Sequence, residues 1–201
     1  WLTCFRAARK QVAKRLAFGE DRMNKALTNL LDGMAASVLL LNKAIKKQAA
    51  LECIVIYANL IDGALRVGLI LKDQLESASS RIDESLLRQT DDDPIISERR
   101  IYKMALERGV ITSIVYDKLS DAYDLRNKCI HRYLLCSITY DDVTGLVFQM
   151  AELKQEVRDA VFRLEREQIE KGVGMTVEGP DLDDRYHIES AMQKERYCNL
   201  K

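Results

Sequence analysis

The stretch of residues 49–75, AALECIVIYANLIDGALRVGLILKDQL, decides the fold. If this stretch is helical, apolar side chains cover almost its whole circumference. A polar stripe interrupts them, with gaps of 7, 3, 4 and 7 positions: Glu52, Asn59, Asp62, Arg66 and Asp73. Those gaps keep the stripe narrow, facing either water or a polar cleft. Because other helices must cover the rest, the stretch predicts the central helix of a bundle.

The rest of the chain also favours helix. Prolines occur only at Pro94 and Pro180, so long segments lack the residue that interrupts helices most strongly. Apolar spacing predicts further helices over 95–108, 112–125 and 141–171. Residues 76–94 predict a polar connection with one weak helical turn. The predicted fold class is therefore all-α, an up-and-down bundle of four to five helices with an extra N-terminal helix.

The length of 201 residues fits one domain with some additional chain. We expect a basic N-terminal helical segment over 1–44, the helical bundle over 45–171 and a polar C-terminal tail over 172–201. Lys plus Arg and Asp plus Glu both total 31, so the formal net charge is zero. This balance disfavours a protein that coats nucleic acid by bulk charge. The first 50 residues hold ten basic and three acidic side chains, which predicts a solvated basic face or, alternatively, a local nucleic-acid contact.

Cysteine usage indicates the compartment. The chain has five cysteines, an odd number, and no C-x-x-C pair, which is typical of a reducing cytoplasm. Cys129, His131 and Cys136 lack a fourth ligand and the paired spacing of zinc sites, so we expect no metal and no other cofactor. Uninterrupted apolar runs are much shorter than the roughly 20 residues of a membrane span. We therefore expect a cytoplasmic protein without membrane association.

Polar side chains interrupt the apolar pattern at 124–133, DLRNKCIHRY. On a continuous helix Asn127 and His131, four apart, share a face, so Asn127 is expected to hydrogen-bond the imidazole. Arg126 and Tyr133, seven apart, are expected to stack two turns apart. A histidine can transfer a proton at neutral pH, and a guanidinium can hold phosphate oxygens. These residues are the candidate site.

This stretch resembles the signature of HEPN domains, R-x4–6-H, and its longer form R-x4-H-x-Y. Arg126, His131 and Tyr133 match the longer form, which is that of HEPN toxins of HEPN/MNT toxin–antitoxin systems. The order of the predicted helices is similar to that family over about 45–170. The basic N-terminal segment and the tail lie outside the resemblance.

The resemblance implies a homodimer whose two motifs face each other across a cleft. Many members of the family are metal-independent endoribonucleases that act as toxins or in defence against phage. Arg126 and His131 would be catalytic, and Asn127 would orient His131 or contact phosphate. One imidazole would remove the 2′-hydroxyl proton and the other would protonate the leaving 5′-oxygen. RNA would then be the partner and substrate.

Tyr133 has a second implied role. In the branch with the longer motif this tyrosine is the site at which a nucleotidyltransferase antitoxin attaches AMP. Such an antitoxin is therefore an expected partner. The polar stripe, with Glu52, Asn59, Asp62 and Arg66, could line the same cleft, or it could form the solvent-facing edge.

Other interpretations stay open. Arg126 could pair with Asp124 or another acidic residue, Asn127 could cap a helix, and His131 could be a half-buried structural side chain. A second alternative keeps the HEPN-like fold as a non-catalytic binding or adaptor module for RNA, a nucleotide or a protein partner. A third, a helix–turn–helix DNA-binding regulator, lacks a short glycine turn after the basic helix.

Overall fold

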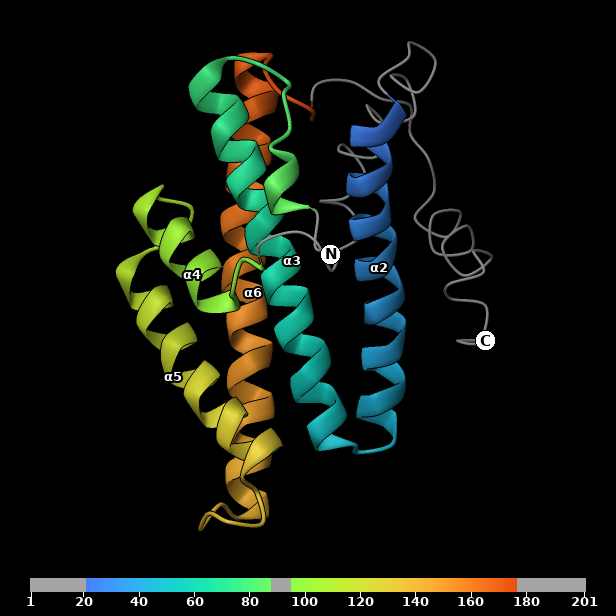
Figure 1. Cartoon of the computed structure of the whole chain (residues 1–201), viewed down its shortest axis with the longest axis vertical. Helices are drawn as coiled ribbons and strands as arrows, with labels where there is room; N and C mark the ends of the chain where they lie inside the picture. The colour runs from blue at the N-terminus through green and yellow to red at the C-terminus, as the bar shows by residue number, and fades with distance from the viewer. Residues whose placement is uncertain (1–20, 88–94, 177–201) are drawn as a thin grey trace.

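The computed structural model describes residues 21–87 and 95–176, which form an all-α helical bundle (Figure 1). No strand occurs in these two ranges. They contain five α-helices and one short 3₁₀ helix: α2 (Asp21–Lys46), α3 (Ala50–Ser77), η2 (Glu84–Leu86), α4 (Glu98–Glu107), α5 (Ser113–His131) and α6 (Tyr140–Lys171). The all-α fold class is therefore confirmed.

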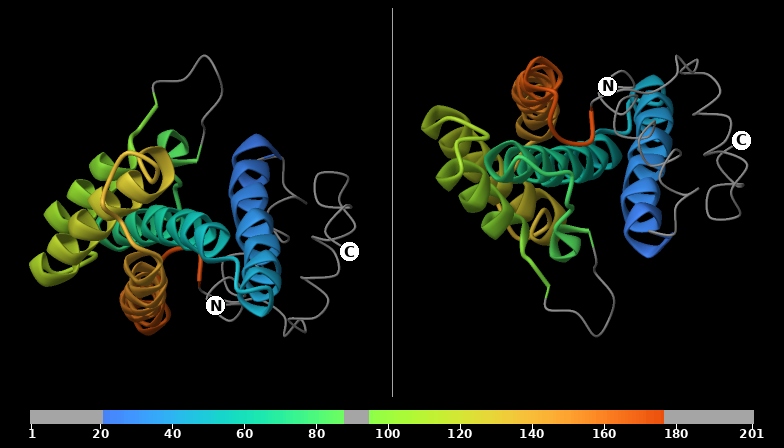
Figure 2. Two further views of the ribbon diagram at one scale, coloured as in Figure 1. Left: turned by 90° about the horizontal axis from the view of Figure 1, so that it is seen from below. Right: turned by 90° about the horizontal axis from the view of Figure 1, so that it is seen from above.

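Helix α3 is the central helix, as its sequence predicts. It packs mainly against α6, α2 and α4 and contacts α5 only slightly. Both end-on views show it between α2 and the α4–α5 pair, with α6 along a third side (Figure 2). By length and composition α3 is apolar enough to cross a membrane, but 83% of its most apolar window is buried by the bundle. Core helices of soluble proteins share this property, so the fold is compatible with a soluble protein.

Helix α2 belongs to the same apolar core as α3. Its buried side chains include Leu27, Leu31 and Met34. The two helices approach closely at Gly63, where a Cβ atom would lie 2.8 Å from the sulfur of Met34. The predicted division at residue 44 therefore falls inside α2 and does not separate two structural units. The basic residues before position 21 lie outside the described part of the chain.

The end of α5 corrects one expectation. The sequence predicts a helix over 112–125 followed by a short separate segment, but α5 runs to His131. Neither glycine nor proline occurs within Ser113–His131, and Cys129 faces the core, so nothing ends the helix at 125. The Arg132 N–H then bonds the Lys128 carbonyl and the chain turns. The candidate residues Arg126 and Asn127 thus lie inside a regular helix.

The other helix ends follow local capping chemistry. Ser97 caps α4, which starts three residues later than predicted, and Thr139 with Asp142 forms a capping box at α6. In the described part of the predicted connection, up to residue 87, the short helix η2 is consistent with the weak helical turn expected there. The predicted polar tail begins differently, because Met175 and Thr176 are buried against the bundle.

Candidate functional site

The guanidinium of Arg126 is held in an ion pair between α5 and α4. Its Nη1 atom lies 2.5 Å from Oε2 of Glu98, the first residue of α4. Only 13% of the Arg126 side chain and 19% of the Glu98 side chain are exposed. A charge pair that is this far removed from water is much less screened than a surface pair. Arg126 therefore pairs with an acidic residue, as the structural alternative requires, although its partner is not Asp124.

Two further contacts orient the same guanidinium. Its Nε and Nη2 atoms donate to Asn127 Oδ1 at 3.3 and 3.0 Å, and its carbon lies 4.5 Å from the centre of the Tyr123 ring. An arginine has five N–H groups. One N–H on each Nη nitrogen makes no hydrogen bond to any described residue. Arg126 is thus fixed in place while it retains donors for a ligand such as phosphate.

Helix α3 brings Asp62 close to this ion pair. Asp62 Oδ2 accepts a hydrogen bond from Arg66 Nε at 2.7 Å, whereas its Oδ1 is buried without a hydrogen-bond partner. Burial raises the pKa of Asp62 above its ordinary value, and the Glu98 charge adds to this shift, while Arg66 and Arg126 act in the opposite direction. Asp62 is therefore within the electrostatic field of the Arg126 ion pair.

Arg66 itself is a structural residue. Its side chain is buried, and Nη1 and Nη2 donate to the carbonyls of Leu86 at 2.8 Å and Ile96 at 3.4 Å. The guanidinium thus ties α3 to η2 and to the segment that leads into α4. This burial fits neither a residue that lines an open cleft nor one on a solvent-facing edge.

His131 is the last residue of α5, and its side chain is exposed. No hydrogen bond joins it to another residue in the described ranges, and Asn127 Oδ1 is instead used by Arg126. The expected Asn127–His131 hydrogen bond is therefore wrong. So are the half-buried histidine and the capping asparagine of the structural alternative. His131 is accessible to a ligand or to a partner.

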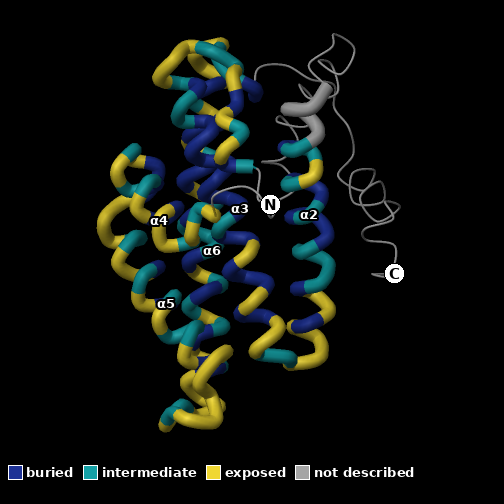
Figure 3. The backbone as a smooth tube through the Cα atoms, in the orientation of Figure 1, coloured by how far each residue is buried: buried dark blue, intermediate teal, exposed yellow. Residues whose placement is uncertain are grey.

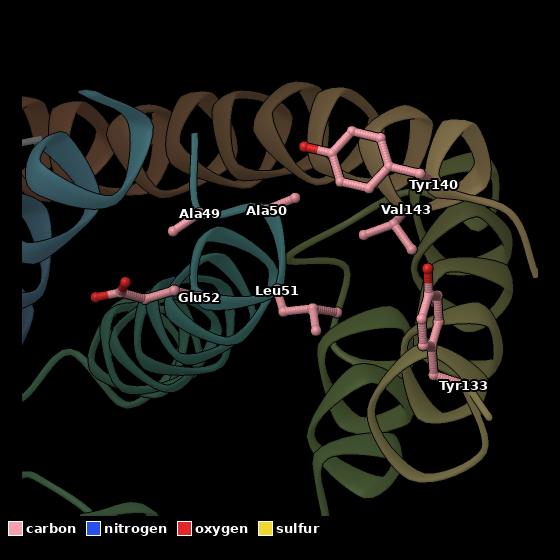
Figure 4. Close-up of a pocket in the computed structure, with 7 residues that line it drawn as sticks. All are labelled: Ala49, Ala50, Leu51, Glu52, Tyr133, Tyr140 and Val143. Atoms are coloured by element: carbon pink, nitrogen blue, oxygen red, sulfur yellow. The ribbon is translucent and has the colours of Figure 1, made fainter. Parts of the chain in front are cut away.

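Tyr133 lies beyond the end of α5, so the expected stacking on Arg126 is also wrong. It lines a pocket of about 290 Å³ with the start of α3 and the start of α6 (Figure 4). The pocket is lined by Ala49, Ala50, Leu51, Glu52, Tyr133, Tyr140 and Val143. In the close-up the Tyr133 and Tyr140 rings flank Val143, and the Glu52 carboxylate points away from both rings.

The predicted cleft-lining residues do not share one cleft. Glu52 lines the Tyr133 pocket, Asn59 is exposed, and Asp62 lies near Arg126. Glu52 and Arg66 are 14 positions apart, which on an α-helix is roughly 21 Å. The helical spacing of the stripe correctly predicts that its residues share one helix face. Along its length, however, that face lies beside several different parts of the structure.

Several exposed apolar side chains belong to residues near the end of α5 and the starts of α3 and α6. Figure 3 colours much of the backbone at this end of the bundle as exposed. We call these apolar side chains the apolar end surface: Leu51, Val55, Ile130, Tyr133, Leu134, Leu135 and Tyr140. Ile130 immediately precedes His131, and Leu134 and Leu135 are almost fully exposed. His131 therefore lies beside apolar surface that a second molecule could cover.

Sequence reasoning missed Glu98 and Tyr102, which are four residues apart on α4. The Tyr102 hydroxyl donates to Glu98 Oε1, and burial together with the Glu98 charge raises the pKa of Tyr102 above its ordinary value. Their spacing indicates a shared helix face, but only the fold shows that this face meets Arg126. Among the residues that the structure describes, no three potential ligands cluster as a metal site.

Comparisons with known proteins add no relative: no family model matches the chain, and neither a curated protein nor a solved structure shows significant similarity to it.

Proposed function

We propose that this chain is a metal-independent endoribonuclease of HEPN type, a toxin or phage-defence effector, which cleaves RNA in a cleft between two copies. The observation that carries the proposal is the contrast on one helix between a fixed guanidinium, Arg126, and an accessible imidazole, His131. These two groups match the chemical needs of internal RNA cleavage. A fixed cation stabilises charge on the phosphorane, and an exposed imidazole transfers protons.

The reaction follows from these roles. One imidazole takes the proton from the ribose 2′-hydroxyl, and the 2′-oxygen then attacks the adjacent phosphorus. The bond from phosphorus to the 5′-oxygen breaks, and a second imidazole protonates that oxygen. The two remaining N–H groups of Arg126 donate to the non-bridging oxygens. The products are a 2′,3′-cyclic phosphate and a free 5′-hydroxyl.

Two copies are needed for this division of labour. Each chain offers one His131, whereas the reaction uses an acid and a base. Five positions turn an α-helix by about 140°, so Arg126 and His131 of one chain diverge rather than converge. The apolar end surface beside His131 supports a homodimer, because pairing would cover its exposed leucine and tyrosine side chains.

The remaining expectations concern partners and location. The Tyr133 side chain is exposed in the turn that follows α5, which supports a nucleotidyltransferase antitoxin that attaches AMP to the tyrosine hydroxyl. Cys53, Cys129 and Cys136 are free thiols, and burial raises the pKa of the first two, which suits a reducing cytoplasm.

One observation favours the alternative, a non-catalytic binding or adaptor module. Arg126 already has a carboxylate partner, as a structural arginine would.

The decisive experiment compares the wild-type chain with His131→Ala on total tRNA and messenger RNA in EDTA. We expect fragments with cyclic phosphate ends from the wild type and none from His131→Ala. The melting temperature should be unchanged, because His131 is exposed and bonds no described residue. His187→Ala, which changes the second histidine, lies outside the described residues and serves as the control that retains cleavage.

Three results would contradict the proposal. Cleavage by His131→Ala would remove the imidazole from the reaction, and loss of cleavage in EDTA would exclude a metal-free mechanism. A clean monomer at micromolar concentration would exclude the composite cleft. A well-folded dimer that binds RNA without cutting it would instead support the adaptor alternative.

A further inference from the structure

Glu98 is fixed at both of its oxygen atoms. Oε2 accepts from Arg126 Nη1 at 2.5 Å, and Oε1 accepts from the hydroxyl of Tyr102. The Tyr102 ring is buried and cannot follow a moving carboxylate without disturbing the core. Glu98 also begins α4, where the helix dipole favours a negative charge. The carboxylate therefore points at Arg126 in one defined orientation.

The consequence for Arg126 is preorganisation. Glu98 holds Nη1, Asn127 holds the Nε and Nη2 edge, and Tyr123 supports the flat face. A guanidinium that is already oriented stabilises developing phosphorane charge without rearranging during the reaction. A small misplacement of such a group costs rate even when substrate binding is unchanged.

We propose that Glu98 is a positioning residue for Arg126, and that Tyr102 in turn fixes Glu98. This inference rests on the proposed ribonuclease function and assigns a residue to it that touches neither substrate nor reacting atoms. Asp62 from α3 is the other acidic group close to the pair, but its bonded oxygen is used by Arg66 rather than Arg126. Glu98 alone among the described carboxylates contacts the Arg126 guanidinium directly.

A matched control lies on the same helix pair. Arg99 and Asp124 also join α4 to α5, and the Arg99 guanidinium carbon lies 4.8 Å from the centre of the same Tyr123 ring. This second pair is exposed, at 57% and 58% of its side chains, and neither member bonds Arg126. Asp124→Asn therefore removes an ion pair between the two helices and leaves the support of Arg126 intact.

The test measures RNA cleavage kinetics on the full chain. Glu98→Gln should lower kcat about 100-fold with little change in KM, because it misplaces a group that acts in the transition state. Glu98→Asp, which keeps the charge, should recover part of the rate, and Tyr102→Phe should give an intermediate loss. Asp124→Asn should cleave at the wild-type rate.

A double-mutant cycle separates positioning from a general structural role. If Glu98 acts through Arg126, Glu98→Gln should cause no further loss in the Arg126→Ala background. An equal loss in both backgrounds, or a wild-type rate in Glu98→Gln, would overturn the inference and leave the ribonuclease proposal standing.

Failure of the proposed function has a different signature. No cleavage by the wild-type chain would remove the reaction in which Glu98 is proposed to act, and would overturn both. The pairing itself is then measured by NMR of the Arg126 Nη1–H groups, one of which donates to Glu98. Their exchange with water should accelerate in Glu98→Gln and stay unchanged in Asp124→Asn, and equal exchange in both would show that Glu98 does not hold the guanidinium.

Discussion

Two polar clusters lie inside this bundle, and they differ in charge and in how completely they are paired. The amide cluster, Gln74, Gln168 and Thr176, lies where α3 and α6 end, at the top of Figure 1. Gln168 Nε2 donates to Gln74 Oε1 and to the Leu71 carbonyl, both at 3.0 Å. Gln168 Oε1 accepts from the N–H and the hydroxyl of Thr176 at 3.2 and 2.8 Å. Every amide atom in this buried group has a partner.

The ionic cluster, Asp62, Glu98 and Arg126, is charged, partly exposed and incompletely paired. Asp62 Oδ1 has no hydrogen-bond partner, and Arg126 retains N–H groups that bond no described residue. A fully paired neutral cluster has no capacity left for a ligand and can only hold helices together. A charged cluster with unused donors costs stability but can bind. The difference distinguishes a structural polar group from a candidate site.

The largest effect on stability should come from the amide cluster. Gln168→Ala leaves a cavity and strips Thr176 N–H of its buried acceptor, so the free energy of unfolding should fall by about 3 kcal/mol. Gln155→Ala, on the exposed side of the same helix, should cost no more than about 0.5 kcal/mol. Denaturant unfolding measures both. Equal small losses would show that the amide cluster does not stabilise the bundle.

Cleavage activity also distinguishes the amide cluster from the ionic cluster. Gln168→Ala should retain the wild-type cleavage rate per folded molecule at low temperature, because the amide cluster is remote from Arg126 and His131. Loss of cleavage in a folded Gln168→Ala chain would mean that the two clusters are coupled.

The sequence predicts the helices that carry the two clusters better than it predicts the contacts within the clusters. The nearly continuous apolar circumference of 49–75 identifies the central helix, because only burial on several sides explains it. Gln74 lies in that stretch and is fully buried, yet nothing local reveals its partner, which is 94 positions away. Arg126 and His131 can be identified as candidate site residues from their residue types alone. Glu98 is an ordinary first-turn glutamate until α4 packs on α5, so its role depends on tertiary structure.

A moderate effect is expected from removing the guanidinium of the ionic cluster. Arg126→Met leaves Glu98 bonded only by Tyr102 and should lower the free energy of unfolding by about 1–2 kcal/mol. Arg99→Met breaks the exposed pair between the same helices and should cost about 0.5 kcal/mol or less. Cleavage should fall to a low residual rate only in Arg126→Met. A stability loss larger than that of Gln168→Ala would make Arg126 primarily a structural residue.

The smallest change in stability is expected from Asp62→Asn, and this change should be stabilising rather than destabilising. The pKa of this carboxyl is raised above its ordinary value of 3.8, chiefly by burial, whereas the unfolded chain keeps the ordinary value. Between those two pKa values the folded state holds more protons, so rising pH lowers stability across that window, and the cost is complete once the pH exceeds the folded-state pKa. Asp62→Asn cannot ionise and can still accept from Arg66, so its melting temperature should slightly exceed the wild-type value at pH 7.

That advantage of Asp62→Asn should shrink as the pH falls towards 3.8, because the wild-type carboxyl then becomes neutral as well. Asp117→Asn, on the exposed side of α5, is the control for a general change in net charge. A wild-type chain that is more stable than Asp62→Asn at pH 7 would mean that Arg66 and Arg126 together outweigh the cost of burial. Asp62 would then act as a paired partner, and the ionic cluster would resemble the amide cluster more closely than its unpaired oxygen indicates.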